Sequence, residues 1–179
     1  MRKDVEKMGM AEELTVIHRD KDGRILSKRV YPKDYGLIHN LLVKLGLRHN
    51  TMTATGFAHT AYLLGDKDNA SASYGYIAIG TNNTAATVDD TALGTEVVRK
   101  TAVFTRLTTV KANDTAQWTA TFSSADNLTG TMTIYEVGVF NDSTAGDMLT
   151  RIVYAGDNMN WDAGDTLEIR VKVQIKQGT

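Results

Sequence analysis

The stretch DTLEIRVKVQIK, residues 165–176, alternates apolar and polar side chains without interruption. Successive side chains of a β-strand point to opposite faces of the sheet, so this pattern is typical of a strand with one buried and one solvated face. The side chains predicted to face the core are Leu167, Ile169, Val171, Val173 and Ile175. An antiparallel sheet is therefore the starting point for the fold.

The chain upstream of this strand, back to residue 74, carries the same kind of signal. Short β-rich runs such as QWTATF (117–122) and TMTIYEVGVF (131–140) are separated by stretches rich in Gly, Asn and Asp. About six short strands with such regular turn signals predict an antiparallel β-sandwich, here over residues 74–179.

Residues 14–73 are predicted to hold a β-hairpin, one α-helix and a connecting segment. The runs LTVIHR (14–19) and RILSKRVY (24–31) flank Asp-Lys-Asp-Gly, in which Asp-Gly supplies the positive φ of a tight turn. After Pro32, apolar residues recur at helical spacing and predict an amphipathic helix: Leu37, Ile38, Leu41, Leu42 and Leu45. Residues 1–13 are charged, and we expect an N-terminal arm that is frayed or orders on a neighbouring copy.

Composition narrows the classes of function. Of the 179 residues, 42% are hydrophobic and 23% are charged, which suits a folded domain. The net charge of −1 argues against a nucleic-acid or membrane partner. The absence of cysteine excludes disulfides and thiolate metal sites. Because the first residues contain no apolar signal segment and no run approaches membrane-spanning length, we expect the protein to be cytoplasmic where it is made.

Catalytic and metal-binding patterns are weak. The four histidines lie in no recognised catalytic frame, and a ligand role for the pair His49 and His59 is the less favoured interpretation. The stretches GDKDNAS (65–71) and DNMNWDAGD (157–165) offer oxygen ligands for calcium, but Asp and Asn also initiate turns, and we favour turns. The sequence therefore predicts no enzyme, no catalytic residue, no metal and no cofactor.

Glu136 is unusual because it lies within IYEVGVF (134–140), a run that otherwise looks buried. A carboxylate in such a place must be paired with a cation or must bind a proton. We predict a structural ion pair with an arginine on another strand, with Arg99 and Arg106 as the first candidates and Arg151 as a third.

Two segments resemble a pattern in structural proteins of tailed bacteriophages and tailed archaeal viruses. The first is YIAIGTNNTAATVDDTALGTEVVR (76–99), and the second is IYEVGVFNDSTAGDMLTRIVYA (134–155). Their order and spacing are similar to those in the N-terminal part of tail-collar fibre proteins, and the likeness covers roughly residues 74–175. The chain has no repetitive shaft, so the expectation is a compact neck, collar, tail or baseplate adaptor, or a capsid-decorating subunit, in the virion.

This resemblance implies a role for the long polar connection GTNNTAATVDDTALG (80–94). Its hydroxyl and amide groups can form hydrogen bonds to another protein surface at a low desolvation cost. Long loops within compact domains are usually functional or disordered. We therefore expect a contact with a neighbouring copy or another virion protein, through Asn82, Asn83, Thr84, Thr87, Asp89 and Asp90.

The predicted function is thus that of a non-enzymatic virion protein that assembles as a ring or cluster of identical copies. The alternative is a β-sandwich that binds carbohydrate or a host surface. In that case Trp161, in an Asn- and Asp-rich turn, is the best residue for stacking on a sugar, with Trp118 and Tyr154 as further candidates. An enzyme is the third interpretation.

Overall fold

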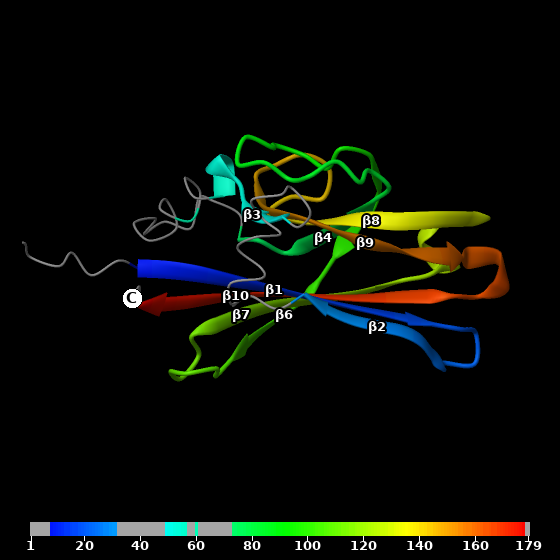
Figure 1. Ribbon diagram of the computed structural model, residues 1–179, viewed down its shortest axis with the longest axis horizontal. Coiled ribbons are helices and arrows are strands. Elements are labelled where there is room, and N and C mark those ends of the chain that lie inside the picture. The colour runs from blue at the N-terminus through cyan, green and yellow to red at the C-terminus, as the bar shows by residue number, and fades with distance from the viewer. Residues whose placement is uncertain (1–7, 32–48, 57–59, 61–72, 178–179) are drawn as a thin grey trace, which may run out of the picture.

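Two antiparallel five-stranded sheets pack face to face and form a β-sandwich (Figure 1). The computed structural model describes residues 8–31, 49–56, 60 and 73–177. The first sheet, in spatial order, consists of β2 (Ile25–Tyr31), β1 (Met8–Arg19), β10 (Thr166–Gln177), β7 (Thr115–Phe122) and β6 (Val103–Leu107). The second sheet consists of β3 (His49–Met52), β9 (Met148–Asn160), β8 (Thr131–Phe140), β4 (Tyr76–Gly80) and β5 (Glu96–Thr101). The prediction of a mainly β antiparallel sandwich is confirmed.

The core lies between the two sheets and is closed by aromatic side chains. Of the predicted core residues of β10, the side chain of Ile175 lies outside the described part of the chain, and Leu167, Ile169, Val171 and Val173 are buried. They pack against Ile77, Phe122, Ile134, Ile152 and other apolar residues of both sheets. The indole nitrogen of Trp118 donates a hydrogen bond to the carbonyl of Tyr74, at 2.8 Å, so this buried polar atom has a partner.

The N-terminal hairpin is confirmed, and its turn has the predicted chemistry. Gly23 has a φ of 78°, and the amide of Asp20 donates to the carbonyl of Arg24 at 3.0 Å. β1 begins at Met8, however, and residues 8–13 of the predicted arm pair with residues 172–177 of β10. The boundaries predicted at residues 13 and 73 therefore do not separate the sheets. The predicted helix over residues 37–45 lies outside the described residues.

The chain crosses from one sheet to the other at Ala102. β5 ends at Thr101 in the second sheet, and β6 begins at Val103 in the first sheet. The amide of Ala102 donates to the carbonyl of Gly75 at 2.8 Å, and its side chain is buried. Short 3-10 helices, η1 (Ser124–Asp126) and η2 (Trp161–Ala163), follow β7 and β9, and residues 54–56 are also helical.

Candidate functional site

The polar connection between β4 and β5, residues 81–95, lies across the outer face of the second sheet (Figure 1, green). Ala86 and Leu93 of this loop are buried, and Leu93 packs in a small cluster with Ala78, Phe140 and Met148. The inner side of this loop is therefore attached to its own sheet. The sequence did not reveal this, because the same hydroxyl and amide groups can contact either the parent sheet or a neighbour.

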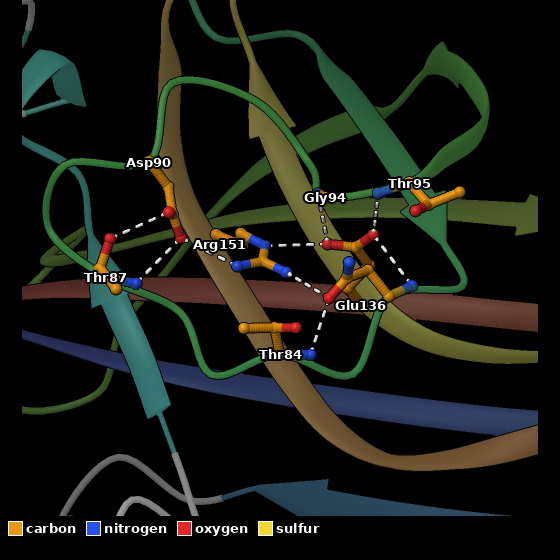
Figure 2. Close-up of polar contacts among 8 residues, drawn as sticks. Thr84, Thr87, Asp90, Gly94, Thr95, Glu136 and Arg151 are labelled. Atoms are coloured by element: carbon orange, nitrogen blue, oxygen red, sulfur yellow. Dashed lines mark hydrogen bonds and ion pairs between the residues drawn. The ribbon is translucent and has the colours of Figure 1, made fainter.

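Glu136 of β8 holds the two ends of the loop together (Figure 2). Its side chain is fully buried, and it accepts hydrogen bonds from the amide of Asn82 at 3.2 Å, of Gly94 at 2.9 Å and of Thr95 at 2.8 Å. A fourth donor is Nε of Arg151, at 2.8 Å. Charge-assisted hydrogen bonds of this kind are about twice as strong as neutral ones. The carboxylate therefore closes the loop at its base.

Strand register explains why a carboxylate fits at this position. Glu136 lies opposite Gly80 of β4, which in turn lies opposite Glu96 of β5. A β-carbon on residue 80 would come within 2.5 Å of Oε1 of Glu136 and would also collide with the carbonyl oxygen of Thr95. The glycine that ends the YIAIG strand therefore makes room for a carboxylate that comes much later in the sequence.

Arg151 of β9 supplies the positive charge. Its side chain is nearly buried, and Nη1 lies 2.9 Å from Oδ2 of Asp90 in the loop, while Nη2 lies 3.5 Å from Oδ1 of Asn82. Burial alone would lower the pKa of Arg151, but the hydrogen bonds to Asp90 and Glu136 outweigh it and raise the pKa. Likewise, burial acts to raise the pKa of Asp90, but the Thr87 amide and Arg151 overcome it and lower the pKa. Both groups are therefore held in their ionised forms.

The rest of the loop is ordered by its own side chains. The amide and hydroxyl of Thr87 each donate to the carboxylate of Asp90 at 2.9 Å. The amide of Thr84 donates to Oδ1 of Asn82 at 2.7 Å. Of the six predicted contact residues, Asn82 and Asp90 thus bind inward, and the side chains of Asn83, Thr84, Thr87 and Asp89 are exposed.

The predicted burial and pairing of Glu136 are confirmed, but the partner is the third candidate, Arg151. Arg99 forms an ion pair with Glu96 at 2.7 Å and lies 3.5 Å above the ring of Phe140. Arg106 lies on β6 of the other sheet. Arg151 reaches the carboxylate because β8 and β9 are neighbours and Arg151 lies opposite Gly138, two residues from Glu136 on the same face.

The aromatic residues proposed for sugar stacking are buried. Trp161, Trp118 and Tyr154 have exposed fractions of 1%, 5% and 6%. Stacking on a glycan requires an accessible ring face, so the structure removes the residues on which the carbohydrate-binding alternative depended. Trp161 instead opens η2 and closes one end of the sandwich core.

The polar residues of the 157–165 segment have structural partners. Asp157 accepts from the hydroxyl of Ser27 at 2.7 Å and forms an ion pair with Arg29 at 2.9 Å. Asp165 binds Nε2 of His18 at 2.9 Å and accepts the amide of Asn160 at 2.9 Å. Of these contacts, the one between Asp165 and the amide of Asn160 is local turn chemistry of the kind we favoured, whereas the contacts to Ser27, Arg29 and His18 connect this segment to β1 and β2. The other acidic stretch, residues 65–71, lies outside the described residues, as do His59 and the side chain of His49.

The sequence analysis did not identify Glu12 as a carboxylate in contact with the core, because Glu12 lies in the charged N-terminal segment. It occupies the same face of β1 as Leu14 and Val16, and its Oε2 accepts from the hydroxyl of Thr150 in the opposite sheet at 2.9 Å. Its Oε1 is buried without a hydrogen bond to the described residues. Burial raises the pKa of Glu12 to about 7, although the Thr150 hydroxyl opposes this shift. The sequence did contain a signal for this position, because residues 12, 14 and 16 of a strand lie on one face and Leu14 and Val16 are apolar.

No protein-family model, curated protein or solved structure matches the chain. Within the described ranges, no helix is long and apolar enough to cross a membrane. The same ranges contain no group of three or more His, Asp or Glu side chains arranged to hold a metal ion. Evidence about function therefore rests on the sequence motifs and on the geometry of the loop.

Proposed function

We propose that this chain is a non-enzymatic structural protein of a tailed virus particle. It acts through contacts between its own copies and with other virion proteins, as a neck, collar, tail or baseplate adaptor or as a capsid-decorating subunit. It is made in the host cytoplasm and assembled into the virion. The alternative of a glycan-binding module has no exposed aromatic platform among the three residues proposed for it.

One observation carries the proposal: the two sequence segments that resemble virion proteins form one structural unit. The first supplies β4, the loop and β5, and the second supplies β8 and β9. The Glu of the second segment binds the amides at both ends of the loop in the first. A resemblance in order and spacing thus corresponds to a physical dependence between the segments, rather than to two unrelated short matches.

The loop suits a contact between subunits because it is ordered before any partner binds. Ordering a flexible loop on binding costs free energy, and a preformed loop avoids that cost. Glu136 and Arg151 of the sheet hold the loop, in part through Asp90 (Figure 2). The exposed residues of the loop include Asn83, Thr84, Thr87, Val88 and Asp89. The proposal assigns this exposed side to a neighbouring virion subunit.

Two measurements test the proposed function. An antibody raised against the purified chain should label purified tailed particles of the encoding virus at one defined position in negative-stain images. The purified chain should form a ring or defined cluster by sedimentation, and Asp89→Arg should weaken that assembly. Asp162→Arg, at an exposed position in η2, is the matched control and should leave it unchanged. Particles without label would overturn the proposal.

A further inference from the structure

The two edge strands of the first sheet both expose apolar side chains. On β6, Val103 is 67% and Phe104 is 50% exposed. On β2, Ile25, Leu26 and Val30 are 52%, 57% and 47% exposed. An edge strand presents open backbone hydrogen-bonding groups, so an edge with apolar side chains is a template for pairing with another chain unless charges block it.

β2 is blocked. Lys28 lies at the centre of this strand, so antiparallel pairing of two copies about the centre would place two lysines opposite each other. Ser27 and Arg29 are already bound to Asp157. β5, an edge of the second sheet, is charged too, and Nζ of its Lys100 binds Asp126 and the carbonyl of Thr121 in the first sheet.

β6 has no such protection. Its sequence is VFTRL, with Thr105 at its centre and Arg106 as its single charge. In the part of the chain that the structure describes, Arg106 forms no ion pair or hydrogen bond. Phe104 and Arg106 lie opposite Trp118 and Ala116 of β7 and so share one face, while Val103, Thr105 and Leu107 share the other.

We propose that β6 is a self-complementary interface that pairs antiparallel with β6 of a second copy, with Thr105 opposite Thr105. In this register each Phe104 lies opposite Arg106 of the second copy, and each Val103 lies opposite its Leu107. A guanidinium over an aromatic face is a favourable cation–π contact, and it gives the unpartnered Arg106 a partner. The first sheets of the two copies, each of five strands, become one continuous sheet, and the interface is two-fold and isologous.

This inference rests on the proposed function for its biological setting, because repeated copies in a particle are where a small contact becomes effective. A five-residue edge buries less than the roughly 1,200 Å² of a standard stable interface. We therefore expect a weak dimer in solution that is reinforced where copies are held close together. The β6–β7 hairpin extends away from the second sheet (Figure 1, yellow-green), and β6 is the last strand of the first sheet, with no further strand beside it among the described residues.

The test uses the fact that residue 105 faces itself across the two-fold axis. Thr105→Lys and Thr105→Glu change an exposed side chain, and each should weaken self-association by about fivefold, since like charges directly opposite on paired strands repel. An equimolar mixture of the two variants places the introduced lysine opposite the introduced glutamate and should restore association to at least the wild-type level. Fluorescence-detected sedimentation, with only one variant labelled, measures the mixed dimer directly.

Val30→Lys, on the other edge of the same sheet, is the matched control and should not change association. A wild-type chain that stays monomeric up to roughly millimolar concentration would overturn the inference. So would a Thr105→Lys chain that dimerises as the wild type does, or a mixture that does not regain association. The two results with the Thr105 variants leave the proposed function standing, because neither touches the expected ring or the particle labelling. A monomeric wild-type chain would also contradict the expected ring, and particle labelling alone then decides whether the chain is a virion protein.

Discussion

Two glutamates, the fully buried Glu136 and the half-buried Glu12, have very different hydrogen-bond partners. Glu136 accepts four hydrogen bonds, from three amides and one arginine. Glu12 accepts one, from a threonine hydroxyl, and its other oxygen has no hydrogen bond from the described residues. Because donors replace the water that a carboxylate loses on burial, the number of donors decides whether the buried charge stabilises or destabilises the fold.

Glu136 is thus a fully paired structural carboxylate, whereas Glu12 is a half-buried titratable group beside the core residues Leu14 and Val16. At Glu136 the charge is neutralised locally by Arg151, and Arg151 is shared with Asp90. At Glu12 desolvation dominates, and the pKa rises to about 7.

Glu136→Ala should cost about 3–5 kcal/mol in free energy of unfolding, as expected when one partner of a buried ion pair is removed. The change leaves Arg151 buried with one carboxylate fewer and deprives the amides of Asn82, Gly94 and Thr95 of their acceptor. Chemical denaturation monitored by tryptophan fluorescence measures the loss. Glu96→Ala removes a carboxylate that is 31% exposed, while Arg99 keeps its hydrogen bonds to the carbonyls of Asp142 and Ala145, so this control should cost only about 1 kcal/mol. Equal effects would contradict the comparison.

Glu12→Gln should remove a pH dependence. Because the folded-state pKa is raised from 4.5 to about 7, the contribution of Glu12 to stability is greatest below pH 4.5 and is lost as the pH rises through about 7. The wild type should therefore lose roughly 2–3 kcal/mol through this group between pH 5 and pH 8. Glu12→Gln keeps an acceptor for Thr150 and carries no charge, so it should be the more stable chain at pH 8.

The measurement is the difference in unfolding free energy between wild type and Glu12→Gln at each pH. Taking the difference cancels the titration of the remaining groups, including Asp90, whose lowered pKa places its effect below pH 4. Stability curves that run parallel from pH 5 to pH 8 would show that Glu12 ionises normally in the folded chain.

Gly80→Ala should cost about 1–3 kcal/mol, the usual range for a methyl group forced into a packed site. The new carbon would lie 2.5 Å from Oε1 of Glu136, so the carboxylate must move away from its donors. Gly75→Ala is a close control just before the same strand, because the nearest atom to its new carbon would be 3.8 Å away. A smaller loss for Gly80→Ala than for Gly75→Ala would show that the carboxylate can shift without consequence.

The sequence predicted those parts of the fold that depend on residues close together along the chain. The alternation in β10 and the Asp-Gly turn of the hairpin are local, and both were confirmed. The pairing of β1 with β10 was not predicted, and the paired residues lie more than 140 positions apart. No local pattern specifies such a pairing.

The candidate site was predicted in part for the same reason. The run IYEVGVF is apolar enough to show that Glu136 is buried and needs a cation, but the choice among three arginines depends on which strands are neighbours. The order β9, β8, β4 in the second sheet decides it in favour of Arg151. That the loop covers its own sheet follows from the acceptor role of Glu136 toward backbone amides, which carry no side-chain signal in the sequence.

Asp90→Asn should have the smallest effect, about 1 kcal/mol, because Asp90 is partly exposed and water can replace some of its contacts. The change weakens the contacts of residue 90 with Arg151 and Thr87 and leaves Glu136 and its donors intact. We therefore expect a local effect: in hydrogen exchange, the amide of Thr87, which donates to Asp90, should lose protection. The amides of Gly94 and Thr95, which donate to Glu136, should keep theirs.

Asp89→Asn is the control for this last change, because it is the same substitution at an exposed adjacent residue, and it should alter neither stability nor exchange. The pattern of protection also separates two descriptions of the loop. If Glu136 alone holds the two ends of the loop, Asp90→Asn should reduce amide protection only in the part of the loop around residue 90. If Arg151 instead couples both carboxylates into one unit, Asp90→Asn would expose the Thr95 amide as well, and its cost would approach that of Glu136→Ala. We expect the first result, because the amides of Gly94 and Thr95 bind Glu136 directly and do not depend on Arg151 for their acceptor.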